Sequence, residues 1–119
     1  MRIQGIDHVQ IVGPSGCEPA ARAFYGELLG LEELPRPTTL PDPDGCWFRV
    51  GTQELHVGVE APFRPAQKGH PSFLVDDLAA LVGRLEDEGY AATPENSIPG
   101  VTRAFVNDPF GNRLELRQA

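Results

Sequence analysis

The chain has 119 residues, which suits one compact domain with enough buried surface to fold without disulfides. Its formal net charge of −7 argues against nucleic acid or an anionic membrane as a partner, and no run of about eighteen apolar residues could span a bilayer. The N-terminus lacks a signal-peptide pattern, and Cys17 and Cys46 occur in unrelated contexts. We therefore expect a cytoplasmic protein with two reduced thiols, a disulfide or a catalytic pair being the alternative.

The first half of the sequence predicts the element order βαβββ. Residues 3–12 alternate as a half-buried strand, and the segment EPAARAFYGELLGL has apolar residues at helical spacing with Gly30 at its C′ position. A short strand is expected within residues 31–36, followed by the proline-rich loop 37–45. The segments CWFRV and ELHVGVE then predict a hairpin across GTQ.

The second half predicts the same order again. HPSFLV is expected to be a strand, and DDLAALVGRLEDEG a helix with Asp76 or Asp77 as N-cap and Gly89 after its end. YAAT predicts a short strand, and TRAFVN and NRLELRQ predict two strands joined by DPFG turn chemistry. The sequence thus predicts an α+β fold of two tandem βαβββ modules in a single domain, residues 1–119. The modules cover residues 1–60 and 70–119, and residues 61–69 connect them.

Four side chains that can bind metals occupy matched places in the two halves. His8 and His70, in the opening segments, are 62 positions apart; His56 and Glu115, in the closing strands, are 59 apart. Alternation along the strands places all four on the face opposite the apolar residues that the helices can cover. A strand histidine on its own is commonly structural, but three in matched positions beside a glutamate favour a metal site.

The expected ligand set suits one first-row divalent ion, namely Zn, Ni, Co, Fe or Mn. Four protein ligands could close a tetrahedral zinc site, or they could leave water positions on a five- or six-coordinate ion. Only the second arrangement is clearly catalytic, and the residue types alone do not determine which coordination number the ion has.

The segments FYGELLGLEEL, GHPSFLVDDLAALVGRLEDEGY and DPFGNRLEL resemble the vicinal oxygen chelate superfamily, which includes glyoxalase I, methylmalonyl-CoA epimerase, extradiol dioxygenases, thiol transferases and bleomycin resistance proteins. The resemblance covers nearly the whole chain. It implies a cupped mixed sheet with helices on its outer face around one metal, and a homodimer. By resemblance, His8, His70 and Glu115 match the shared metal triad, and His56 matches a fourth ligand position.

The fourth position departs from the family pattern, because the glyoxalase branch usually has a carboxylate there. The resemblance implies an isomerase or lyase that stabilises an enediolate, with Glu115 or a nearby carboxylate as the catalytic base. A dioxygenase needs an open triad of two histidines and one carboxylate, so a coordinating His56 would remove one of its open sites. Whether His56 coordinates, and whether the site forms within one chain or between two, stays open.

Further residues on the ligand face are candidates for a substrate pocket. They are Gln10, Glu54, Phe105, Arg103 and Arg113. The arginines would suit the anionic substrate of a thiol transferase, or they could be ordinary surface charges. A function of a different class, the non-catalytic binding of an antibiotic as in bleomycin resistance proteins, also stays open, although an intact ligand set counts against it.

Overall fold

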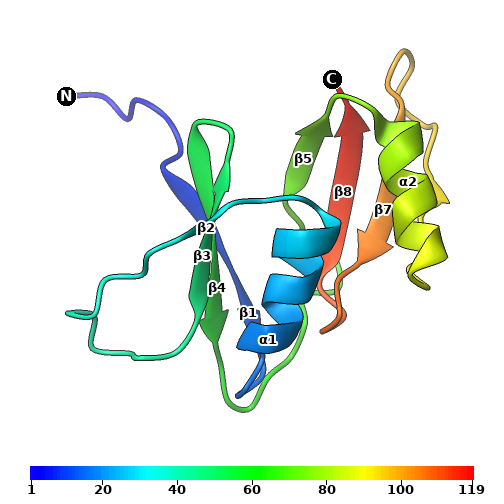
Figure 1. The fold of residues 1–119 in the computed structure, drawn as a ribbon. Helices are drawn as coiled ribbons and strands as arrows, with labels where there is room; N and C mark the ends of the chain where they lie inside the picture. Colours follow the sequence, from blue (N-terminus) through cyan, green and yellow to red (C-terminus); the bar gives the residue numbers. More distant parts are fainter. The chain divides into compact units, whose positions relative to one another are not determined.

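The structure is a computed structural model that describes all 119 residues. The chain forms two compact units, residues 1–64 and 65–119. Each unit contains one four-stranded mixed sheet with helical structure on one face, as Figure 1 shows for each unit taken by itself. The fold is α+β and consists of two tandem βαβββ modules, as the sequence predicts.

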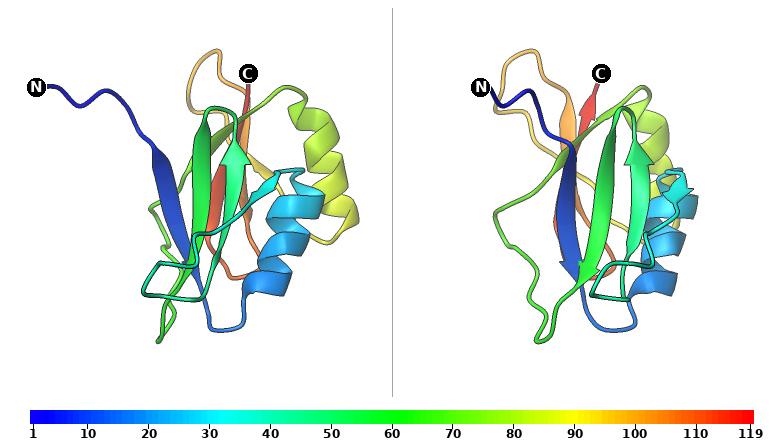
Figure 2. Two further views of the ribbon diagram at one scale, coloured as in Figure 1. Left: turned by 60° about the vertical axis from the view of Figure 1, so that its left-hand side comes forward. Right: turned by 90° about the vertical axis from the view of Figure 1, so that its left-hand side faces the viewer.

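The first unit contains four strands and one helical segment. They are β1 (His8–Gly13), α1 (Glu18–Ala21), η1 (Arg22–Leu28), β2 (Glu33–Leu34), β3 (Cys46–Val50) and β4 (Gln53–Val59). The strand order is β1-β4-β3-β2, with β1 parallel to β4 and the other pairs antiparallel. Figure 2 shows β1 in blue beside β4 in green, with β3 beyond it.

The core of this unit lies between the sheet and the continuous helical segment α1–η1. Tyr25 and Phe24 are fully buried and form an edge-to-face pair with ring centroids 4.9 Å apart, and Tyr25 also packs near Phe48 of β3. The last seven residues of the segment form a π-helix, and Gly30 follows with φ 76°, which fits its expected C′ role. The apolar residues predicted to face the core from this helix therefore include its two most buried aromatic side chains.

The second unit repeats the arrangement. Its elements are β5 (Ser72–Val75), α2 (Leu78–Asp87), β6 (Thr93–Pro94), β7 (Arg103–Asn107) and β8 (Arg113–Gln118). The strand order is β5-β8-β7-β6, again with the first pair parallel and the others antiparallel. Asp77 is the N-cap of α2 and accepts a hydrogen bond from the Ala80 amide, and Leu85 of α2 is fully buried together with Leu114 and Leu116 of β8.

The strand registers confirm the internal repeat at the level of single residues. His56 pairs with Gln10 on β1 and with Trp47 on β3, whereas Glu115 pairs with Ser72 on β5 and with Phe105 on β7. Gln10 and Ser72 are 62 positions apart, and His56 and Glu115 are 59 apart. These are the offsets seen in the sequence, so the two candidate ligands on the closing strands occupy equivalent sheet positions.

Three predicted strand boundaries were wrong. The first strand begins at His8 rather than residue 3, because its parallel partner β4 begins only at Gln53, after the Gly51–Thr52 turn. The strand predicted at residues 90–93 forms only at Thr93–Pro94, because the Tyr90 amide bonds the Leu85 carbonyl and ends α2.

The third correction concerns His70, which lies two residues before β5 and not within a strand. Pro71 stands between His70 and the strand; its carbonyl accepts the Glu115 amide, but proline has no N–H to extend the ladder. The expectation that every histidine occupies a strand is therefore wrong for this one. No helix of the protein is long and apolar enough to cross a membrane.

Candidate metal ligands and substrate pocket

In the first unit, His56 is held in a stack of three rings. Its imidazole lies parallel to the Trp47 indole, with centroids 3.8 Å apart and 2° between the planes, and His8 stacks at 4.1 Å and 18°. Their registers place all three side chains on the sheet face opposite the helical segment. The sequence did not determine which way Trp47 points, whereas the structure places it on the ligand face.

The two histidines of this stack use different ring nitrogens for their hydrogen bonds. His8 Nδ1 lies 2.9 Å from Asp7 Oδ2, which leaves Nε2 as the nitrogen with a free lone pair. His56 Nε2 lies 2.9 Å from Glu54 Oε1, so in His56 the free nitrogen is Nδ1. His56 is 5% exposed and His8 is exposed, so His56 is the more firmly fixed of the pair.

In the second unit, His70 and Glu115 come together. His70 Nε2 lies 3.8 Å from Glu115 Oε1, and His70 Nδ1 lies 2.9 Å from the Lys68 carbonyl. A backbone carbonyl can only accept, so Nδ1 carries a proton, and in the neutral tautomer that this bond selects the lone pair is on Nε2, the nitrogen nearer Glu115. Histidines that bind metals commonly have this second hydrogen bond, which fixes the tautomer.

Glu115 is 3% exposed and is held by two donors. Arg103 Nη1 donates to Oε1 at 2.5 Å, and the Ser72 hydroxyl donates to Oε2. Burial opposes ionisation of Glu115, but the hydrogen bonds from Ser72 and Arg103 and the positive charge of Arg103 outweigh it and hold its pKa below the usual range. Glu115 is therefore a carboxylate at neutral pH, and its oxygens keep lone pairs beyond those two bonds.

The four candidate ligands fit a divalent metal in chemistry and in hydrogen-bonding state. Neither unit by itself gathers three or more His, Cys, Asp or Glu side chains that could hold an ion. Each unit instead supplies one pair, namely His8 with His56 and His70 with Glu115. A neutral imidazole with a fixed proton and an ionised carboxylate are the states in which these side chains bind first-row metals.

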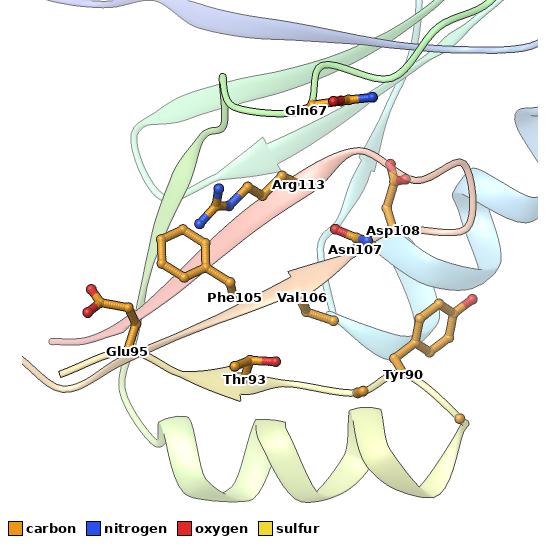
Figure 3. Close-up of a pocket in the computed structure, with 11 residues that line it drawn as sticks. Gln67, Tyr90, Thr93, Glu95, Phe105, Val106, Asn107, Asp108 and Arg113 are labelled. Carbon is orange, nitrogen blue, oxygen red and sulfur yellow. The ribbon is translucent and has the colours of Figure 1, made fainter. Parts of the chain in front are cut away.

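A pocket of about 710 Å³ opens on the second unit (Figure 3). Phe105 and Arg113 line it, and the Arg113 guanidinium lies 4.1 Å from the centroid of the Phe105 ring. The other polar lining residues are Gln67, Tyr90, Thr93, Glu95, Asn107 and Asp108. Its volume is within the range of sites for small molecules.

Only some of the predicted pocket residues line the pocket in the structure; the others contact neighbouring side chains. Phe105 and Arg113 line the pocket, whereas Arg103 does not; it binds Glu95 and Glu115 instead. In the first unit, Glu54 bonds His56, and Gln10 fills the space above Gly58. Glu95, Asn107 and Thr93 were missed, although Asn107 and Thr93 share the Glu115 face, which the strand register reveals.

The fold and the matched ligand pairs define a class of protein, and comparisons with known proteins give the family. Residues 5–116 match the family described as the Glyoxalase/Bleomycin resistance protein/Dioxygenase superfamily, so the chain belongs to this superfamily. This is the vicinal oxygen chelate superfamily that the sequence resembles. No curated protein matches the chain.

Solved structures agree with this assignment. A putative glyoxalase family protein from Bacillus anthracis is 47% identical, with a TM-score of 0.94 over 99% of this chain and 97% of that one. A lactoylglutathione lyase from Agrobacterium tumefaciens is 23% identical, with a TM-score of 0.76 over 100% and 96%. A fosfomycin resistance protein from Listeria monocytogenes is 13% identical, with a TM-score of 0.79 over 99% and 95%. The last two show a shared fold only.

Proposed function

We propose that the protein is a divalent-metal-dependent enzyme of the isomerase or lyase kind, acting on a small oxygenated substrate. The proposed ligands are His8, His56, His70 and Glu115. The observation that carries the proposal is the geometry of the second pair: the Lys68 carbonyl binds His70 Nδ1 and leaves Nε2, the nitrogen through which this imidazole can coordinate, 3.8 Å from the buried carboxylate of Glu115. A divalent ion bound there would coordinate two neighbouring substrate oxygens and stabilise the negative charge that develops on them.

In this proposal the residues around Glu115 determine its orientation and its pKa. Glu115 is the proposed base, and Arg103 and Ser72 fix its two oxygens in place. A base must lie within hydrogen-bonding distance of the proton it removes, so this fixed orientation is useful for catalysis. Because its pKa is lowered, Glu115 is ready to accept a proton at neutral pH but is a weak base, which is why a metal that acidifies the substrate is needed.

Metal content is the test of this proposal. Tag-free protein purified without chelator should contain one metal ion per chain by elemental mass spectrometry, and His70→Ala should lose it. Lys68→Ala is the matched control, because the backbone carbonyl that holds His70 Nδ1 remains in that variant. If the protein contains no metal and takes none up, the metal proposal is wrong, and small-molecule binding without catalysis becomes the better explanation.

A second candidate, an extradiol-type dioxygenase, is favoured by one specific contact. Glu54 bonds Nε2 of His56, so His56 can coordinate only through Nδ1; if Nδ1 does not coordinate, His8, His70 and Glu115 would form a triad of two histidines and one carboxylate with open positions. The dioxygenase hypothesis predicts that the protein binds iron or manganese and that His56→Ala retains it. It also predicts oxygen uptake with a catechol probe. Nickel, cobalt or zinc without oxygen uptake would favour the isomerase or lyase.

We also propose that the protein is a homodimer, and mixing two variants would show how the ligand pairs combine. One variant carries His8→Ala with His56→Ala, and the other carries His70→Ala with Glu115→Gln. If sites form between chains, subunit exchange should restore metal binding in the mixture, because one intact pair comes from each chain. If sites form within a chain, the mixture binds no more metal than the separate variants. Light scattering gives the oligomeric state.

A further inference from the structure

We propose that the pocket on the second unit binds a carboxylate group of the substrate through Arg113, at a position separate from the oxygens that chelate the metal. The inference deepens the proposed function and rests on it for the chelating end of the substrate. It defines the substrate class as a small oxygenated acid with a second, distal carboxylate. The starting observation is an arginine inside the pocket with no anionic partner.

Arg113 is the only cation among the pocket-lining residues, and it makes no salt bridge. Arg103, the other arginine that packs over the Phe105 ring, is committed to Glu95 and Glu115. Arg113 packs its guanidinium over the Phe105 ring (Figure 3), and its central carbon lies 4.1 Å from the ring centroid. Stacking of this kind fixes the plane of the guanidinium while its N–H edge stays available for a ligand.

The charges around the pocket favour a carboxylate over a phosphate or phosphonate. A planar carboxylate accepts two parallel hydrogen bonds from one guanidinium edge and carries a single negative charge. Glu95 and Asp108 also line the pocket, so a dianion would meet two acidic side chains and only one arginine. One available cation therefore matches one negative charge.

The register sets the separation between the two ends of the substrate. Arg113 and Glu115 lie on the same face of β8, two residues apart, which corresponds to about 7 Å along a strand. Phe105 pairs with Glu115 and lies under Arg113, so it forms the apolar floor between the two positions. A chain of a few carbons between the chelating oxygens and the carboxylate would cover this distance.

Arg117 provides a matched control on the same strand. It lies two residues after Glu115, as Arg113 lies two before, and it shares the same face. Arg117 does not line the pocket. A substitution there changes the charge of the face equally but leaves the stacked guanidinium in place.

The first experiment tests the carboxylate position in the metal-free, full-length protein. A ¹H–¹⁵N NMR titration with butanoate, which has no chelating end, should shift the Phe105 and Asn107 amides with a saturable dissociation constant. Arg113→Gln should weaken that binding about 10- to 100-fold, and Arg117→Gln should leave it unchanged. Methylphosphonate should bind more weakly than butanoate. Tighter binding of methylphosphonate, or no effect of Arg113→Gln, would overturn the assignment.

The second experiment separates this inference from the proposed function. The metal-loaded protein is titrated by calorimetry with 2-oxoglutarate and with 2-oxopentanoate, which has the same chelating end but no distal carboxylate. Tighter binding of 2-oxoglutarate by tenfold or more, lost in Arg113→Gln only, supports the inference. Equal metal-dependent binding of both acids would leave the proposed function intact and reject the carboxylate site. Butanoate binding that depends on Arg113, without metal-dependent binding of either acid, would support the carboxylate site and reject the proposed function.

Discussion

The two units have the same topology, yet the residues around their equivalent ligands differ in charge. Beside His56 the first unit has Trp47 and Glu54, whereas beside Glu115 the second has Phe105 and Arg113. Cys46 and Ala104 are equivalent in the two units. The residue before each is Gly45 in the first unit and Arg103 in the second. Gly58 likewise corresponds to Arg117. The first unit thus presents an acidic, aromatic ligand face and the second a face rich in arginine.

This difference shows how two copies of one module can support different kinds of candidate ligand, an imidazole in the first and a carboxylate in the second. An imidazole needs no cationic support, and ring stacking with Trp47 and His8 is enough to orient His56. A buried carboxylate does need support, because desolvation of Glu115 must be offset by hydrogen bonds and a positive charge. The arginines therefore accompany the unit whose candidate ligand is anionic, and of the two without a salt bridge, Arg113 and Arg117, only Arg113 lines the pocket.

The largest expected effect comes from removing the cation that supports Glu115. Arg103→Leu leaves Glu115 and Glu95 without their shared partner, and Glu115 is only 3% exposed. We expect the free energy of unfolding, measured by urea denaturation, to fall by more than in any of the other variants. In the first unit, Glu54→Gln should cost less than about 1 kcal/mol, because the Glu54 side chain is 35% exposed.

Arg117→Leu controls for the loss of an arginine from the same face and should change stability by no more than about 0.5 kcal/mol. If Arg103→Leu and Arg117→Leu cost the same, Arg103 does not offset the burial of Glu115. The contrast drawn between the two units would then be wrong.

The second prediction compares the ligands themselves. His70→Ala should weaken metal binding by more than the roughly 10- to 100-fold that loss of an outer-sphere partner costs. His56→Ala should weaken it by a comparable factor, because Glu54 bonds Nε2 of His56 and leaves Nδ1 to coordinate; a loss of about tenfold or less would show that His56 does not coordinate. Competition titration with a chromogenic chelator measures both constants. Equal losses would show that His56 coordinates as strongly as His70.

Much of this comparison was predictable from the sequence, because period-two alternation and the two offsets place His56 and Glu115 in equivalent positions without any structure. The position of His70 outside a strand was not, since it depends on where Pro71 interrupts the pairing with β8. The Trp47 face and the contacts of Arg103 were not predictable either. They follow from the β3–β4 and β7–β8 registers, which neighbouring strands set together.

The third prediction concerns the glycines that replace arginines in the first unit. Gly45 has φ 112°, and an added Cβ would lie 2.5 Å from the Val57 carbonyl oxygen. Gly45→Ala should therefore reduce the free energy of unfolding by about 2 kcal/mol, since both the backbone conformation and the contact are unfavourable. Gly58→Ala meets only the end of the Gln10 side chain, which can move, so its cost should be below about 1 kcal/mol. Urea denaturation compares the two, and an equal cost would mean that backbone crowding at Gly45 is unimportant.

The smallest effect is expected at Cys46, which faces the helical segment of the first unit where the second unit has Ala104. Burial raises the pKa of the Cys46 thiol from 9.0 to about 11. A raised thiol pKa gives stability that is fully present below pH 9.0 and is lost as the pH rises toward about 11. Cys46→Ala should remove this dependence, so wild type should lose more stability than the variant between pH 8 and about 10.5. Urea denaturation in reducing buffer measures the difference, and parallel pH profiles would show that the thiol has the same pKa in the folded and unfolded states.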